Sequence, residues 1–236
     1  MISKRIKVRL LIILLSGLII LAGLIIYAYA RTWNKAELEF KIHINEELIL
    51  QSVYGESPTF AIWLENPDTG DSKTIFVTNR AGKGDWEGKV EVPTALPKWQ
   101  SIADKERQTE QSDIEVDAVS GATPLPGYFV TRVRVKPGSK WNCWIEMNLA
   151  GDYNQHYKEF DEIEKKTDEF GDGQPAIVYK TYIEAAMGNI VAPEVVGMSI
   201  LNEKGEIIQP LEGITTALEV FDEITIAIVK PKPRII

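Results

Sequence analysis

A short polar string, DAVSGATP, contains the residues of this chain that are best suited to chemistry on a loop. Gly121 and Ala122 are small, so they leave the hydroxyl of the following Thr123 approachable by another molecule. Asp117 lies upstream and can position that hydroxyl, or a cation brought to it. The alternative is a turn in which Asp117 and Ser120 bond local backbone amides. The string therefore predicts either an attachment point at Thr123 or a structural turn.

The spacing D-x-x-S-G-A-T in this string resembles the acceptor motif of proteins that carry covalent flavin mononucleotide (FMN). In that family a dedicated flavin transferase esterifies the Thr hydroxyl to the flavin phosphate, so the resemblance implies covalent FMN on Thr123. The cofactor-binding residues that it implies are Asp117, Ser120, Gly121, Ala122 and Thr123. The chain departs from the family at Pro124, where a hydroxyl or aromatic residue is usual, and Pro124 pushes Thr123 toward extended backbone.

Four stretches together resemble a family of predicted periplasmic proteins that is catalogued only as a domain of unknown function. They are TFAIWLE at 59–65, FVTNRAGKGDW at 76–86, Trp99, and DAVSGATPLPG at 117–127. Genes of that family are often found near flavin transferases and PepSY-type membrane oxidoreductases, so the resemblance implies these two kinds of protein as partners. It covers residues 59–184 and supplies no catalytic residue. The acceptor-like string belongs to that family's own pattern, which leaves a structural role for it open.

Other reactive residues give little support to an enzyme or a metal site. His43 and His156 are the only histidines, and His43 falls on the polar side of an alternating segment, as an exposed residue would. Acidic residues within 168–173 offer oxygen ligands for Ca²⁺ but lack the spacing of an EF-hand loop, so a solvated loop is favoured. No G-x-S-x-G string accompanies the histidines. Cys143 falls on an apolar strand face and is expected to be a small buried hydrophobe.

The N-terminal residues predict a membrane anchor. Residues 10–30 are uncharged, and a helix of that length, at about 1.5 Å per residue, matches a hydrocarbon core of roughly 30 Å. Four basic residues precede this run and two follow it within 31–35, so residues 1–9 are expected in the cytoplasm and residues 31–236 outside it. The string AYA at 28–30 has the form of a signal cleavage site, so a cleaved signal peptide is the alternative. Either interpretation exports the remainder from a bacterial cytoplasm.

Charge and cysteine content narrow the function of the exported part. Five of the 26 Lys and Arg residues lie within the first 31 positions, whereas all 34 Asp and Glu residues follow them. A domain this acidic is not expected to neutralise phosphates, so nucleic acid is not expected as a partner. The single Cys cannot form an internal disulfide, so packing alone must hold the domain together.

The sequence pattern of the exported part predicts β-strands. Residues 38–44 alternate apolar and polar side chains with the period of a half-buried strand. Further runs rich in β-branched and aromatic residues, most of them separated by Gly or Pro, lie at 59–65, 73–78, 89–92, 128–136, 141–148, 176–184, 195–201, 206–209 and 218–229. We therefore expect residues 31–236 to form an all-β, immunoglobulin- or fibronectin-like β-sandwich.

Two polar stretches, 100–115 and 153–174, interrupt these runs, and the second is expected to be a short exposed helix or a loop. No long segment shows a convincing apolar stripe with the 3.6-residue period of a helix. Trp63 and Trp144 each share a strand face with polar neighbours. They can floor a ligand groove or lie under the polar stretches, and cover by those stretches is favoured.

Together these features predict a membrane-anchored extracytoplasmic accessory protein of a flavin-dependent electron-transfer system, with FMN on Thr123 and no catalytic residues of its own. Residues 10–30 would contact membrane lipid. The alternative is a non-redox binding or assembly module with the same fold and no cofactor, which holds a partner at a sandwich end or a sheet edge. The colour of the purified protein distinguishes the two hypotheses.

Overall fold

The computed structural model describes residues 4–30, 32, 35–84, 92, 95–109, 119–159, 173–200 and 205–231. The described chain is mostly β, with two sheets and one N-terminal apolar helix. This confirms the coarse fold class expected from the alternating runs. Residues 89–91 of the expected strand at 89–92, and most of the polar stretch at 153–174, lie outside the described residues.

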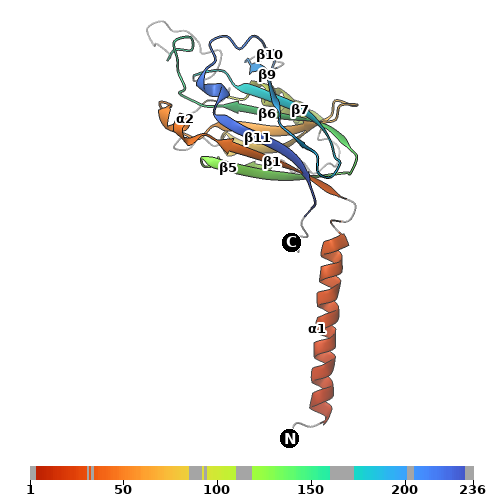
Figure 1. The fold of residues 1–236 in the computed structure, drawn as a ribbon. Helices are drawn as coiled ribbons and strands as arrows, with labels where there is room; N and C mark the ends of the chain where they lie inside the picture. The colour runs from red at the N-terminus through yellow and green to blue at the C-terminus, as the bar shows by residue number, and fades with distance from the viewer. Residues whose placement is uncertain are drawn as a thin grey trace.

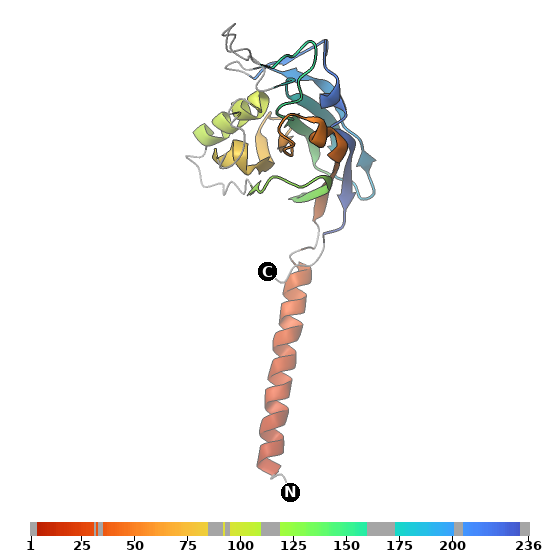
Figure 2. The same ribbon diagram turned by 90° about the vertical axis from the view of Figure 1, so that its left-hand side faces the viewer.

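Helix α1 (Lys4–Ala30) projects from the sheets as a single rod (Figures 1 and 2). Its segment Ile12–Ala30 has a mean hydropathy of 2.5 and is only 6% buried. At about 1.5 Å per residue this segment is roughly 30 Å long, close to the thickness of a hydrocarbon core. The protein therefore has an N-terminal helix that is long and apolar enough to span a membrane.

The first sheet has four strands in the order β5 (Gly127–Val135), β1 (Ala36–Ile44), β11 (Phe221–Val229) and β8 (Ile190–Val191). All of its pairings are antiparallel. Four apolar side chains of β1 are fully buried between the sheets, namely Leu38, Phe40, Ile42 and Ile44. The alternation at 38–44 therefore predicted both the strand and its buried face.

The second sheet has seven strands. Their order is β10 (Ile207–Ile208), β9 (Glu194–Ser199), β7 (Ile177–Glu184), β6 (Lys140–Asn148), β2 (Thr59–Glu65), β3 (Ser72–Thr78) and β4 (Val119–Gly121). Among the described strands of this sheet, only β4 pairs in parallel, with β3. An immunoglobulin constant-type sandwich has sheets of four and three strands, so sheets of four and seven strands do not confirm the immunoglobulin- or fibronectin-like assignment.

Aromatic side chains hold the two sheets together. The ring of Phe60 lies 5.0 Å from Phe76, 5.2 Å from Phe129 and 5.3 Å from Phe221, measured between centroids. Phe60 and Phe76 come from the seven-stranded sheet, whereas Phe129 and Phe221 come from the four-stranded sheet. Because these edge-to-face and tilted pairs bury large rings, they contribute strongly to the free energy of folding.

A second apolar cluster lies on the outer side of the seven-stranded sheet, under helix α4 (Pro97–Thr109). Trp63 and Trp144 stack there with parallel rings, 5.8 Å apart, and Trp99 of α4 packs in the same cluster. The expected cover of the two tryptophans by the polar stretches is confirmed for the first stretch, which contributes most of α4, whereas most of the second lies outside the described residues. The sequence analysis found no convincing helical stripe here, because the first apolar residue of α4 that packs in this cluster is Trp99, ahead of the polar stretch, and Leu96 precedes the helix.

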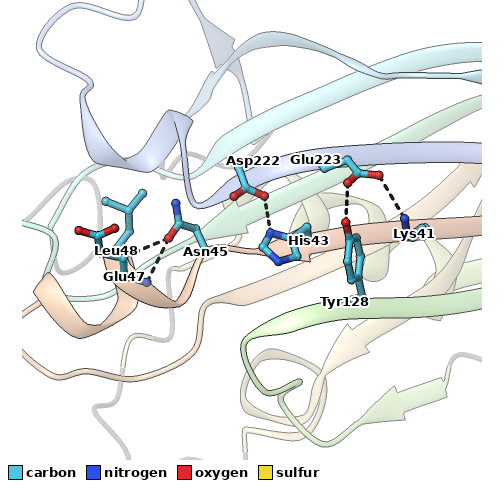
Figure 3. Close-up of polar contacts among 8 residues, drawn as sticks. All are labelled: Lys41, His43, Asn45, Glu47, Leu48, Tyr128, Asp222 and Glu223. Carbon is cyan, nitrogen blue, oxygen red and sulfur yellow. Dashed lines mark hydrogen bonds and ion pairs between the residues drawn. The ribbon is translucent and has the colours of Figure 1, made fainter.

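The remaining described helices are short. Helix α2 (Glu46–Gln51) follows β1, and its N-cap Asn45 accepts hydrogen bonds from the amides of Glu47 and Leu48 (Figure 3). Helix α3 (Asn79–Lys83) follows β3 and contacts β4. A 3₁₀ turn, η1 (Thr216–Leu218), precedes β11.

Candidate functional site

The acceptor-like string contributes the edge strand β4. Ser120 lies opposite Val77, and Gly121 lies opposite Thr78 of β3. Pairing with β3 satisfies backbone groups of this segment, so Val119–Gly121 forms a strand instead of a turn. Asp117 and the side chain of Ser120 lie outside the described part of the chain.

Gly121 is required by packing against Phe76. A Cβ atom at position 121 would lie 2.7 Å from Cε2 of the Phe76 ring, which is closer than carbon atoms approach. The Phe76 ring cannot easily move away, because two other rings pack against it. Its centroid lies 4.6 Å from that of Phe129 and 5.0 Å from that of Phe60. The glycine in the acceptor-like string therefore has a structural reason that is independent of any cofactor.

Thr123 lies in the segment that joins the edge strand of one sheet to the edge strand of the other. Its side chain is half-buried, the preceding Ala122 is exposed, and Leu125 is 81% exposed. Thr123 forms no hydrogen bond with any residue that the structure describes. Its hydroxyl therefore lies between two strands and has no hydrogen-bond partner among the described residues.

A cluster of ionisable side chains lies on the outer face of the four-stranded sheet (Figure 3). Glu223 accepts a hydrogen bond of 2.7 Å from the Tyr128 hydroxyl and one of 3.2 Å from the Lys41 ammonium. The Lys41 Nζ atom also lies 4.0 Å from the centre of the Tyr128 ring. The hydrogen bonds to Glu223 raise the pKa of Lys41 and of Tyr128, and they lower the pKa of Glu223.

His43 extends this cluster. Its Nδ1 atom lies 2.6 Å from Oδ1 of Asp222, and its ring centre lies 4.6 Å from that of Tyr128. The side chain is 33% exposed on the polar face of β1, as the alternation predicted. Within the described ranges, no group of three or more His, Cys, Asp and Glu side chains is placed to hold a metal ion. The cluster is therefore an ion-paired, solvated surface.

A buried carboxylate fixes helix α4 on the sheet. Glu146 of β6 accepts hydrogen bonds from the backbone amides of Lys98 and Trp99, at 3.0 Å and 2.6 Å, and one from the Ser199 hydroxyl. These amides belong to the first turn of α4, whose N–H groups have no partner inside the helix. Burial raises the pKa of Glu146 to about 7, although the three hydrogen bonds oppose that increase. Glu146 therefore holds the cover of the Trp63–Trp144 stack.

Cys143 and Arg80 are buried for structural reasons. Burial raises the pKa of the Cys143 thiol to about 12, so it is protonated at neutral pH, which confirms it as a small buried hydrophobe. Arg80 of α3 is 5% exposed. Its Nη1 atom lies 3.1 Å from Oε2 of Glu56 and donates a hydrogen bond to the carbonyl of Ser57. Burial lowers the pKa of Arg80, and the charge of Glu56 opposes this. Arg80 thus ties α3 to the loop before β2.

Sequence reasoning missed the Glu223 cluster and the Glu146 cap. Lys41 and Glu223 are 182 positions apart, and Trp99 and Glu146 are 47 positions apart. No local pattern reports such pairs, because the sheet order alone brings them together. The acceptor-like string was visible because its residues are consecutive.

Comparisons with known proteins identified no relative of this chain. No protein-family model, no curated protein and no solved structure matches the chain. The family resemblance of residues 59–184 therefore stays a prediction that rests on its motifs.

Proposed function

We propose that this chain is a membrane-anchored extracytoplasmic accessory protein of a flavin-dependent electron-transfer system, and that Thr123 carries covalent FMN. One observation supports this most directly. Thr123 comes directly after the exposed Ala122, and the Thr123 hydroxyl makes no hydrogen bond with a described residue. A transferase can therefore approach it without first breaking a hydrogen bond to a described residue.

The flanking strands support a fixed position for the flavin. β4 ends at Gly121 against Phe76, and β5 begins at Gly127 opposite Ile44. The attachment residue is thus tethered closely on both sides, which limits the volume that a bound flavin explores. The protein would supply position and electrostatics, while the flavin supplies the redox chemistry.

The attachment itself is a phosphoryl transfer. The Thr123 oxygen attacks the flavin-side phosphorus of a flavin dinucleotide, and a new P–O bond forms as the pyrophosphate P–O bond breaks. The nucleoside monophosphate leaves, and the hydroxyl proton passes to a base of the transferase. In the family that the string resembles, a dedicated flavin transferase performs this step, so Thr123 needs to supply only the acceptor hydroxyl.

The anchor and its orientation belong to the same proposal. Helix α1 is long and apolar enough to cross a membrane, and the basic residues concentrate before its apolar segment. The positive-inside rule then retains residues 1–9 in the cytoplasm and leaves the β domain outside, next to a PepSY-type oxidoreductase.

Mass spectrometry tests the proposal. Co-expression of the full chain with a flavin transferase in an exporting host should add the mass of one FMN, less one water, to the peptide that contains Thr123. Thr123→Val should abolish the adduct, because it removes the hydroxyl and nearly keeps the shape. Thr131→Val, at a half-buried position of β5, is the matched control and should keep the adduct. An unmodified intact mass in the presence of an active transferase overturns the proposal.

The second candidate is a cofactor-free binding module, and the edge strand β5 favours it. β5 has nine residues and pairs only with β1 among the described strands. Tyr128 and Val130 on this strand are 57% and 49% exposed. An open strand edge of this length can pair with an extended peptide. A colourless protein that binds such a peptide would favour this function over flavin attachment.

A further inference from the structure

One end of the sandwich carries exposed lysines in an otherwise acidic domain. Lys35 precedes β1, Lys136 follows β5, Lys140 begins β6 and Lys230 follows β11. The strand pairings bring these positions together, because Ala36 lies opposite Val135 and Glu37 lies opposite Val229. We call this surface the lysine-rich end.

None of the four lysines forms an ion pair with a residue that the structure describes. Glu184 is the exposed acidic residue among them, opposite Lys140 in the sheet. The turn after β2 adds the exposed Asp68 and Asp71, but it lies on the seven-stranded sheet. The positive charge is thus concentrated toward the four-stranded sheet.

Two large apolar side chains lie exposed at the same end. Met187 is 58% exposed and Ile190 is 67% exposed. Gly188, next to Met187, donates a backbone hydrogen bond to Ile228, and Ile190 lies opposite Ala227 of β11. The backbone amides of Gly138 and Ala185 join the turn after β5 to this apolar turn. Exposed apolar side chains among lysines are the features of a protein surface that contacts lipid headgroups.

The anchor keeps this end near the membrane. α1 leaves the domain where β1 begins and β11 ends (Figures 1 and 2). The chain between Ala30 and Ala36 reaches at most about 20 Å when fully extended. The lysine-rich end therefore stays close to the bilayer surface, where anionic headgroups attract cationic side chains.

We propose that the lysine-rich end docks the β domain onto the anionic headgroups of the membrane that α1 spans, with Met187 and Ile190 entering the interface. The inference rests on the proposed anchoring and is independent of flavin. Docking orients the domain, so that Thr123, near the opposite end of β5, faces away from the bilayer. A group attached there would meet soluble or membrane-protruding partners and not lipid.

The test uses the full chain in vesicles of phosphatidylcholine, with and without phosphatidylglycerol. The native Cys143 is fully buried, so a new cysteine at position 187 (Met187→Cys) can be labelled selectively with an environment-sensitive fluorophore. The matched control is Leu50→Cys, since Leu50 is 71% exposed on α2 beyond the far end of β1. Unlabelled wild-type protein checks that Cys143 does not react.

The label at position 187 should shift to the blue and be quenched by lipids spin-labelled at the headgroup, and only in the anionic vesicles. The label at position 50 should do neither. Removing Lys136 and Lys140 together, as Lys136→Gln and Lys140→Gln, should lower the docked-to-free ratio by roughly fivefold for each lysine. High salt should weaken docking in the same way.

The outcomes distinguish the proposed membrane anchor from the proposed docking of the lysine-rich end. A chain that fails to co-float with vesicles overturns the anchor and, with it, the docking. A chain that co-floats but gives equal quenching at positions 187 and 50, or equal quenching in the two kinds of vesicle, overturns the docking and leaves the anchor standing. A blue shift at position 187 that requires another protein, and not anionic lipid, also overturns it.

Discussion

Replacing Glu146 by Gln should make the free energy of unfolding fall less steeply as the pH rises from about 4.5 to about 7. The carboxyl is fully buried, and its pKa in the folded protein is about 7, above the ordinary 4.5. In this range the folded state keeps a proton that the unfolded state has lost. Unfolding therefore releases a proton, and the free energy of unfolding falls as the pH rises.

The size of the effect follows from the same two values. At about 1.4 kcal/mol per pKa unit, the difference between 4.5 and about 7 corresponds to about 3 kcal/mol. This contribution is present in full below about pH 4.5 and is lost as the pH rises through about 7. In Glu146→Gln it disappears, because the amide does not titrate.

The same variant should have a lower baseline stability. The carboxylate accepts from Lys98 and Ser199 through one oxygen and from Trp99 through the other. An amide keeps one acceptor, so one backbone amide of α4 loses its partner, which costs about 1–3 kcal/mol.

Urea unfolding of the full chain in detergent, followed by tryptophan fluorescence, measures both effects. Glu184→Gln, at an exposed position, is the control and should keep the wild-type slope. A flat wild-type profile, or an unchanged slope in Glu146→Gln, would refute this reasoning.

Two further predictions concern packing. Gly121→Ala should lower the free energy of unfolding by about 1–3 kcal/mol, because its Cβ would lie 2.7 Å from the Phe76 ring. Urea unfolding measures this, and Ala122→Ser at the exposed neighbour should change stability by less than about 0.5 kcal/mol. Cys143 should not react with a thiol reagent at neutral pH until denaturant is added, because its pKa is about 12. Rapid reaction of the native chain would show that the thiol is accessible.

Local patterns predicted the strands well, because each strand carries its own evidence. The run at 59–65 coincides with β2 (Thr59–Glu65), and the alternation at 38–44 gave the buried face of β1. The distribution of strands between the sheets was not predictable in this way. β1 pairs with β11, from the other end of the chain, and no local signal specifies that partner.

Helix α4 was missed for a related reason. Its apolar contacts come from Trp99, Ile102 and Ala103, so the stripe is short and begins before the polar stretch. Its N-terminal amides are satisfied by Glu146, which lies on another strand. A helix whose cap and apolar partner both come from distant segments leaves little signal in its own sequence.

The residues of the acceptor-like string are present for different physical reasons. The Phe76 ring accounts for Gly121, and pairing with β3 accounts for the extended backbone of Val119–Gly121. Neither contact involves the hydroxyl of Thr123. If the string served packing alone, the wild type would carry no adduct and Thr123→Val would leave the fold intact, whereas Gly121→Ala would destabilise it. If Thr123 is the acceptor, the two substitutions affect different properties, because only Thr123→Val removes the adduct from a chain that still folds.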